Sequence, residues 1–345
     1  MHQKYYELTV RSISEENHVN MMAILDKMWG VDYQDNGEFD VPKQITDKTT
    51  SFADLKTLDD LIGLKEVKKY FKRLANYPAT KKIMNAYGVE FPKGFLLYGS
   101  PGTGKSYSVE CLQGEALKND VVIVKEVFAH ATHASKFINS AANGMQEVYT
   151  KLVKQVQNPN VDLGVFYLDE FDSIGSRRGL SNNGEDDKMK TYLNSIMDGE
   201  LSREDIVFVA NTNIVDVIDP SYLRSGRFVT IECEHPTDDN LKSMFELYVN
   251  KVEGNAEIKV FGKLNYNKLV IEASKKRYTG ADVKEVINRS VMDTVSSLLD
   301  NEKAVFVSPP KVYEKNIISL IKSHDLIRSQ KTYDKQNEIG FGDKK

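Results

Sequence analysis

The residues with the clearest chemical potential form a glycine-rich segment, 99–106, with the sequence GSPGTGKS. It fits the pattern G-x-x-x-x-G-K-[ST], whose glycines let successive backbone N–H groups point at phosphate oxygens. In that arrangement Lys105 would reach the β- and γ-phosphates. Ser106 would hold Mg²⁺ and open a helix whose positive end faces the nucleotide. An apolar run before the segment and an amphipathic stretch after it favour a phosphate-binding loop over a chance glycine turn.

A second candidate lies about 65 residues further on, where the apolar run 165–168 leads into Asp169 and Glu170. Two carboxylates at the end of a buried strand are suited to a metal-assisted hydrolysis. Asp169 would bind Mg²⁺ directly or through water, and Glu170 would polarise a water held in line with the γ-phosphate. An acidic pair that merely caps a helix is the alternative, and the position after the phosphate loop disfavours it.

These residues need a scaffold, and the surrounding pattern predicts one. Short apolar runs alternate with amphipathic stretches between residues 51 and 236, which predicts a parallel sheet with helices on both faces. Ligands of such sheets sit at the carboxyl ends of the strands, where the polar residues above fall. The predicted strands are 95–98, 121–124, 165–168, 206–210 and 229–233.

The pattern changes after Pro236, where apolar residues recur at helical spacing. The predicted helices there are 239–252, 267–276, 281–299 and 313–327. The fold class expected is therefore α/β, a P-loop NTPase parallel sheet flanked by helices and followed by a small α-helical lid. The expected organisation is an acidic N-terminal arm (1–50), a nucleotide-binding α/β subdomain (51–236), a helical lid (237–330) and a polar tail (331–345).

Composition excludes several classes of protein. The chain of 345 residues is 41% hydrophobic and 28% charged, which is the mix of a globular protein. Its net charge of −4 gives no support to nucleic-acid binding, and no apolar run approaches the roughly 18 residues that span a bilayer. With two cysteines and no visible secretory signal, a cytoplasmic location is expected.

Taken together, the motifs resemble those of the AAA ATPases, P-loop proteins that remodel other macromolecules as ring hexamers. The resemblance runs from about residue 60 through the helical region. It includes segment 58–64, similar to the family's adenine-side segment, the lead-in strand 93–99, and 114–116 at the end of the P-loop helix. It implies ATP and Mg²⁺ as cofactors. The implied nucleotide contacts are Leu61, Ile62, Gly63, Ser100, Pro101, Gly102, Thr103, Gly104, Lys105, Ser106 and Tyr107.

Further motifs follow the two carboxylates. Segment 210–213 resembles the family's sensor-1 strand end, which implies that Asn213 sits between the P-loop and the carboxylates and places the lytic water. Segment 218–228 resembles the arginine-finger segment. The resemblance implies that Arg224 and Arg227 reach the γ-phosphate bound by a neighbouring subunit, where they would neutralise charge in the transition state.

Two more parts of the resemblance are less complete. Gly280 and Ala281 are similar to the family's Gly-Ala pair at the start of a lid helix, but no arginine stands beside them. Phe137 and Ile138 are similar to the aromatic-aliphatic pair of a central pore loop that grips substrate, although Asn139 replaces the family's glycine. The alternative for Phe137 is a side chain packed in the core of a short helix.

The function implied is an ATP-hydrolysing motor that remodels, disassembles or unfolds a protein substrate as a homo-oligomer, most simply a hexamer. An ATP-dependent assembly or regulatory factor that holds a partner without threading stays open as an alternative, as does a DNA-associated loader. The arm 1–50 is the candidate for an adaptor contact. The 345 residues contain no H-E-x-x-H motif, so the zinc protease of the family's membrane branch is not expected within them.

Overall fold

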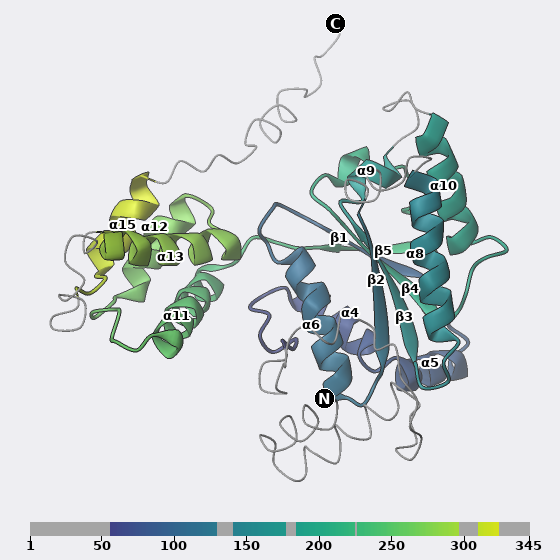
Figure 1. Ribbon diagram of the computed structural model, residues 1–345, viewed down its shortest axis with the longest axis horizontal. Helices are drawn as coiled ribbons and strands as arrows, with labels where there is room; N and C mark the ends of the chain where they lie inside the picture. The colour runs from purple at the N-terminus through teal and green to yellow at the C-terminus, as the bar shows by residue number, and fades with distance from the viewer. Residues whose placement is uncertain (1–55, 130–140, 177–183, 225, 297–309, 324–345) are drawn as a thin grey trace, which may run out of the picture. The chain divides into compact units, whose positions relative to one another are not determined.

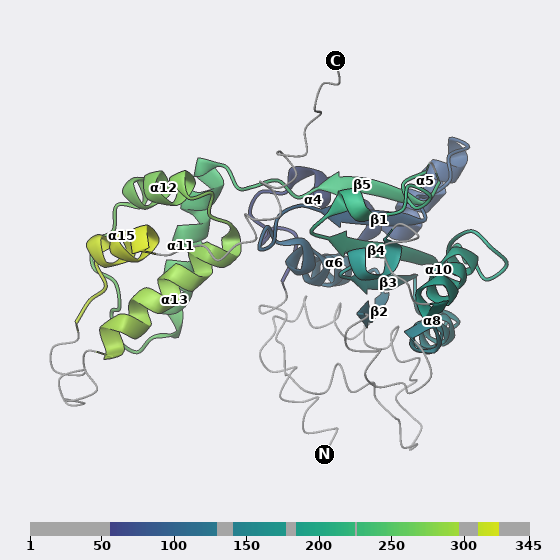
Figure 2. The same ribbon diagram turned by 90° about the horizontal axis from the view of Figure 1, so that it is seen from above.

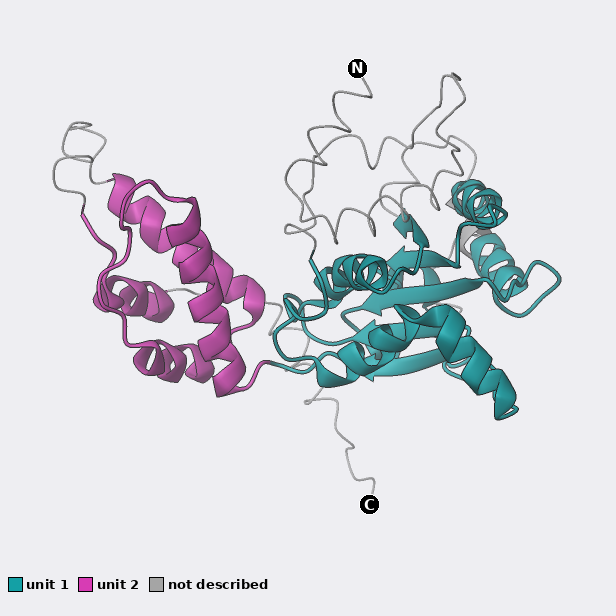
Figure 3. Ribbon diagram, turned by 90° about the horizontal axis from the view of Figure 1, so that it is seen from below, with its two compact units in different colours: residues 1–235 teal, residues 236–345 magenta. Residues whose placement is uncertain are grey.

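The computed structural model describes residues 56–129, 141–176, 184–224, 226–296 and 310–323 (Figure 1). The predicted arm 1–50, the tail 331–345 and the pore candidates Phe137 and Ile138 lie outside the described residues. The chain divides into two compact units, 1–235 and 236–345, which are coloured separately in Figure 3. In the described ranges no helix is both long and apolar enough to cross a membrane.

Unit 1 is built on a sheet whose described strands are all parallel and lie in the order β2-β3-β4-β1-β5 (Figure 2). The predicted α/β fold class is therefore confirmed. The strands are β1 (Gly94–Tyr98), β2 (Ile123–Ala129), β3 (Leu163–Asp169), β4 (Ile206–Thr212) and β5 (Phe228–Glu232).

Both faces of this sheet are covered by helices. Along β4, Val207 and Val209 belong to the core cluster that contains α4 and α6, whereas Phe208 and Ala210 belong to the cluster that contains α8 and α10. This alternation is the period-2 pattern of a strand buried on both faces. The helices of the unit are α4 (Lys65–Leu74), α5 (Tyr77–Ala86), α6 (Lys105–Lys118), α8 (Ala141–Val156), α9 (Asp172–Gly175) and α10 (Gly184–Met197), with the 3₁₀ turn η2 (Val215–Val217).

Strand β2 differs from its prediction. The apolar run predicts 121–124, but the strand begins at Ile123 and continues through Lys125 and Glu126. The prediction ends at residue 124 because Lys125 and Glu126 are charged and interrupt the apolar run. The buried Glu126 carboxylate is satisfied there, because Lys151 Nζ lies 2.8 Å from it and Gln155 Nε2 donates to it at 3.0 Å.

Unit 2 is helical in its described part, as predicted. Its helices α11, α12, α13 and α15 pack around their own core, which includes Phe245, Leu269 and Ile287. Helix α11 begins where the Thr237 side chain accepts a hydrogen bond from Asn240 N at 3.3 Å, a usual N-cap contact. The bounds are α11 (Asp238–Asn255), α12 (Tyr266–Lys275), α13 (Gly280–Ser296) and α15 (Glu314–Ser323).

A close crossing at Gly114 gives the first prediction. A Cβ at Gly114 in α6 would lie 2.1 Å from the carbonyl oxygen of Lys56, so the backbone of segment 56–58 would have to move. That segment is fastened to α6, because Leu58 N donates to Glu115 Oε2 at 3.1 Å. We expect Gly114→Ala to lower the free energy of unfolding by about 1–3 kcal/mol, seen as a lower melting temperature.

The matched control is Gly254→Ala in α11, where a Cβ would meet no atom within 4 Å. Alanine in an unobstructed helical position should leave stability unchanged or raise it by up to about 1 kcal/mol. An unchanged melting temperature for Gly114→Ala would contradict the close contact between α6 and segment 56–58.

Candidate nucleotide site

The P-loop connects the end of β1 to the start of α6. Gly104 caps α6 with a φ of 99°, in the left-handed region that favours glycine. At Gly99, with a φ of 148°, a Cβ would lie 2.4 Å from the carbonyl oxygen of Cys233, so the loop runs against the end of β5. Glycine is therefore required for different reasons at the two positions. Gly104 starts the helix with a left-handed backbone, and Gly99 allows a close approach to the backbone of Cys233.

Lys105 is folded into this loop and is 7% exposed. Its Nζ donates to Gly99 O at 2.7 Å and to Ser100 O at 2.9 Å. Burial lowers the pKa of the Lys105 ammonium, and the carboxylates of Asp172 and Asp169 partly oppose that shift. The Lys105 ammonium can exchange these two carbonyl oxygens for phosphate oxygens. The negative charge of the phosphates would then compensate the ammonium for the water that it lost on burial.

The adenine-side segment lies against the same loop. Leu61 is buried among residues of α4 and α6, and a Cβ at Gly104 would find Leu61 Cδ1 at 3.9 Å and Leu64 Cδ1 at 3.5 Å. Ile62 and Gly63 are half-buried, and Gly63 turns the chain with a φ of 75°. The structure thus brings the predicted base contacts to the start of α6.

The carboxylates stand at the end of β3. Tyr167 OH donates to Asp169 Oδ1 at 3.3 Å, and burial raises the pKa of Tyr167, which keeps that hydroxyl protonated. The Glu170 side chain is exposed, and its backbone has a φ of 51°. A non-glycine residue in this left-handed conformation is uncommon and costs about 1–3 kcal/mol, so it persists only where its surroundings hold it.

Asn211 links the P-loop to the turn that carries Glu170, and the role expected for Asn213 at this position stays a prediction. Asn211 Nδ2 donates to Ser106 Oγ at 3.0 Å, and Asn211 Oδ1 accepts from Glu170 N at 2.9 Å. Val207, Val209 and Asn211 alternate onto the face that α6 covers. Asn213 follows the end of β4 and is exposed. Its action on a lytic water stays a prediction.

Sequence reasoning therefore missed Asn211 as a member of the site. The signal was present, because Asn211 is a polar residue that directly follows the apolar run 206–210 in a buried strand, and a buried amide requires partners.

The two candidate finger arginines differ. Arg227 is committed inside its own unit: it pairs with Asp198, donates to Asn194 Oδ1 at 2.9 Å, and lies 5.7 Å from the Tyr222 ring centroid. Arg224 is exposed, and its side chain makes no hydrogen bond or ion pair with the residues that the structure describes. Arg224 is thus available to another molecule, whereas Arg227 shapes the segment that presents it.

The remaining predicted contacts lie in unit 2 or at the loop's surface. Gly280 and Ala281 open α13, whose first turn is fixed where Thr279 N and Oγ1 donate to Asp282 Oδ2 at 2.6 and 2.8 Å.

The P-loop residues vary in burial: Pro101, Gly102 and Ser106 are exposed, Thr103 is buried, and Ser100 and Tyr107 are half-buried.

A metal could be held by Ser106 and Asp169. Both offer oxygen, and they are linked through Asn211 and Tyr167, since Asn211 Nδ2 also donates to Tyr167 OH at 2.6 Å. Within the described residues no group of three His, Cys, Asp or Glu side chains could hold a metal ion. One hydroxyl and one carboxylate fit Mg²⁺, which is commonly bound by few protein oxygens together with substrate phosphates.

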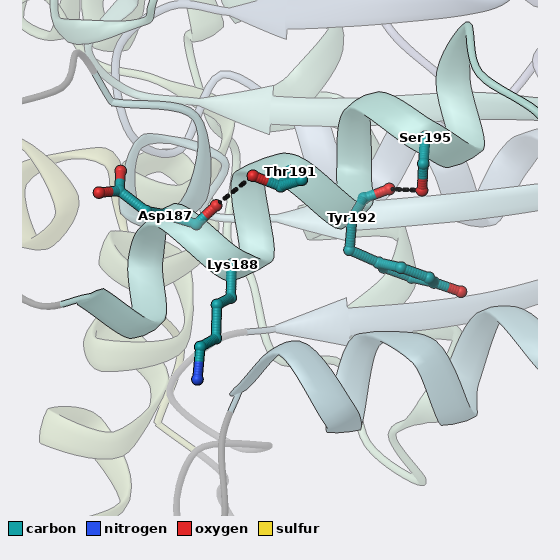
Figure 4. Close-up of a pocket in the computed structure, with 5 residues that line it drawn as sticks. All are labelled: Asp187, Lys188, Thr191, Tyr192 and Ser195. Carbon is teal, nitrogen blue, oxygen red and sulfur yellow. Dashed lines mark hydrogen bonds between the residues drawn. The ribbon is translucent and has the colours of Figure 1, made fainter.

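A hollow on α10 lies apart from these residues and is lined by Asp187, Lys188, Thr191, Tyr192 and Ser195 (Figure 4). Thr191 Oγ1 and Ser195 Oγ both donate at 2.7 Å to carbonyls of their own helix. The hydroxyls of Thr191 and Ser195 are thus already engaged within the helix, and the hollow contains none of the predicted site residues.

Fold and site together define a P-loop nucleotide-binding domain with the parts of an ATPase. Residues 95–234 match the family described as "ATPase family associated with various cellular activities (AAA)". These residues are thus similar to the AAA ATPase family, as the motifs predict.

Several curated proteins are similar to the chain. An ATP-dependent zinc metalloprotease FtsH of Marinobacter nauticus is 26% identical over 284 residues, 79% of this chain and 41% of that protein. A proteasome-activating nucleotidase of Saccharolobus islandicus is 29% identical over 237 residues, 67% of this chain and 55% of that protein. The chain thus spans about half the length of these two relatives.

Proposed function

We propose that this chain binds ATP with Mg²⁺, hydrolyses it, and uses the energy as a ring oligomer to remodel, disassemble or unfold a protein substrate. The observation that carries the proposal is the joining of Ser106, Tyr167 and Glu170 by Asn211 at the carboxyl ends of β3 and β4. The relatives support a protein substrate, since they are named for ATP-dependent proteolysis and for proteasome activation. A cytoplasmic location is part of the proposal and agrees with two buried free cysteines.

The hydrolysis would proceed by attack of water on the γ-phosphorus, with rupture of the bond to the ADP oxygen. Glu170 would take the proton from the attacking water, and Lys105 would hold the β- and γ-phosphates. Ser106 and Asp169 would hold Mg²⁺, whose positive charge would act against that of the phosphate oxygens. Asn213, exposed next to this edge of the sheet, would orient the water.

Assembly enters through Arg224 in our proposal. Its exposed guanidinium would reach the γ-phosphate held by a neighbouring copy, which ties turnover to a ring, most simply a hexamer. We expect Arg224→Ala to bind ATP and melt as the wild type does, yet to lose at least about a hundredfold in turnover. Arg227→Ala should in addition lower the melting temperature, because it removes the donor to Asn194 Oδ1 and leaves Asp198 with Lys93 as its remaining ion-pair partner among the residues described.

Mixed assemblies test whether the arginine acts between copies. Arg224→Ala subunits retain an intact P-loop, and Lys105→Ala subunits retain an intact Arg224, so a mixture should recover part of the activity that each lacks alone. Arg73→Ala is the control for removing a surface arginine. A monomer with full ATPase activity, or mixtures with no recovery, would contradict a finger supplied in trans.

The remodelling itself is tested with a green fluorescent protein that carries an unstructured tail. We expect loss of its fluorescence with ATP but not with a non-hydrolysable analogue. Phe137 and Ile138 remain the proposed grip, and segment 1–50 the proposed adaptor contact. Capture of the tail without unfolding would favour the alternative of a holding factor, and stimulation of turnover by DNA alone would favour a loader.

A further inference from the structure

Asn211 is a buried amide whose side-chain donors and acceptor are all engaged. It is 4% exposed. Its Nδ2 donates both to Ser106 Oγ at 3.0 Å and to Tyr167 OH at 2.6 Å, while its Oδ1 accepts from Glu170 N at 2.9 Å. Because a backbone N–H can only donate, the acceptor end of the amide must face Glu170, and this fixes the donor end toward the two hydroxyls.

The main chain of Asn211 holds the same turn a second time. Phe171 N donates to Asn211 O at 2.8 Å, so two successive peptide N–H groups after Asp169 are bound by one residue. Between them lies Glu170 with its left-handed φ of 51°. An uncommon backbone conformation persists only where its surroundings determine it, and here Asn211 supplies those contacts.

The donor end acts on the groups that would hold the metal. Accepting a hydrogen bond from Asn211 leaves Ser106 Oγ one lone pair for a cation and directs its own hydrogen elsewhere. Accepting from Asn211 likewise turns the Tyr167 O–H toward Asp169 Oδ1, 3.3 Å away. One side chain thus orients a hydroxyl, a carboxylate and the turn that carries Glu170.

From these contacts we infer that Asn211 is a positioning residue that couples the Mg²⁺-binding groups of the P-loop and β3 to the turn that carries Glu170. The inference rests on the proposed ATP hydrolysis and extends it to a residue of a different kind from Asn213. Asn213 is exposed and would act on water directly, whereas Asn211 is buried and acts through Ser106, Tyr167 and Glu170. Partners that orient a metal ligand typically account for about 10–100-fold in metal affinity or activity.

The test measures Mg²⁺ dependence separately from nucleotide binding. A fluorescent ADP analogue is titrated onto wild type, Asn211→Ala and Asn211→Leu, with a chelator and then with increasing Mg²⁺. We expect metal-free affinity to stay within about twofold of wild type. The Mg²⁺ concentration for half-maximal effect should rise about tenfold, and turnover at saturating Mg²⁺ should fall about tenfold or more. Leucine keeps most of the side-chain volume if the alanine variant does not fold.

Tyr149→Phe is the matched control, because it removes another buried hydrogen bond, from Tyr149 OH to Leu201 O at 2.9 Å. It should lower the melting temperature while leaving Mg²⁺ dependence and turnover unchanged. An Asn211 variant that shows the same pattern as this control would overturn the inference and leave Asn211 a structural residue. The proposed function is judged separately by wild-type turnover, since the Mg²⁺ dependence of nucleotide binding does not require hydrolysis.

Discussion

Lys105→Ala is expected to weaken ATP binding by at least about a hundredfold, because the phosphates lose a charge-assisted contact worth about 1.5–3 kcal/mol at each bond. The buried ammonium already gives two hydrogen bonds, to Gly99 O and Ser100 O, and alanine leaves both carbonyls without that donor. Titration with a fluorescent ATP analogue measures the loss. Turnover should disappear with it.

A matched control comes from Lys125 in β2, another lysine whose pKa burial lowers. Lys125→Ala removes a half-buried ammonium from the same sheet, and the carboxylate that acts on this ammonium is Glu110 within α6, not a residue of the P-loop. It should bind the ATP analogue as wild type does. Wild-type affinity in Lys105→Ala would refute the placement of the phosphates on this loop.

Much of the fold could be predicted because the same local pattern marks several of the strands. The strands that carry the site end in a buried apolar run followed by turn or polar residues, and tertiary packing agrees with that local pattern at β1, β3 and β4. The predicted β2 ends too early, because the charged residues Lys125 and Glu126 follow the apolar run. Glu126 is nevertheless buried in the strand, since Lys151 and Gln155 bind its carboxylate. A partner on a separate helix cannot be read from a local pattern.

The site divides in the same way. The P-loop and the carboxylates were predictable because their chemistry is local, carried by a glycine turn and by a strand end. Asn211 was not predicted, because its role depends on contacts with Ser106, 105 residues away, and with Tyr167, 44 residues away. The difference between Arg224 and Arg227 likewise depends on Asn194 in α10 and Asp198 just after it, which no spacing within segment 218–228 reveals.

Glu170→Gln is expected to retain ATP binding and lose about 10²–10⁴-fold in turnover, the usual contribution of a positioned general base. Glutamine keeps the size of the side chain but cannot accept the proton of the attacking water. The contacts that hold the turn are unaffected, because Asn211 Oδ1 and Asp169 Oδ1 bind the backbone N–H of residue 170 and not its side chain. The melting temperature should therefore stay close to that of the wild type.

Glu204→Gln controls for removing one exposed carboxylate, since Glu204 pairs only with Lys81 at 3.1 Å among the side chains described and lies in the loop before β4. It should change neither ATP affinity nor turnover. Single-turnover hydrolysis, measured with enzyme in excess over ATP, separates the chemical step from product release, and the loss in Glu170→Gln should appear in that step. If Glu170→Gln hydrolyses ATP at the wild-type rate in a single turnover, Glu170 is not the base, and the left-handed turn that presents it has no catalytic purpose.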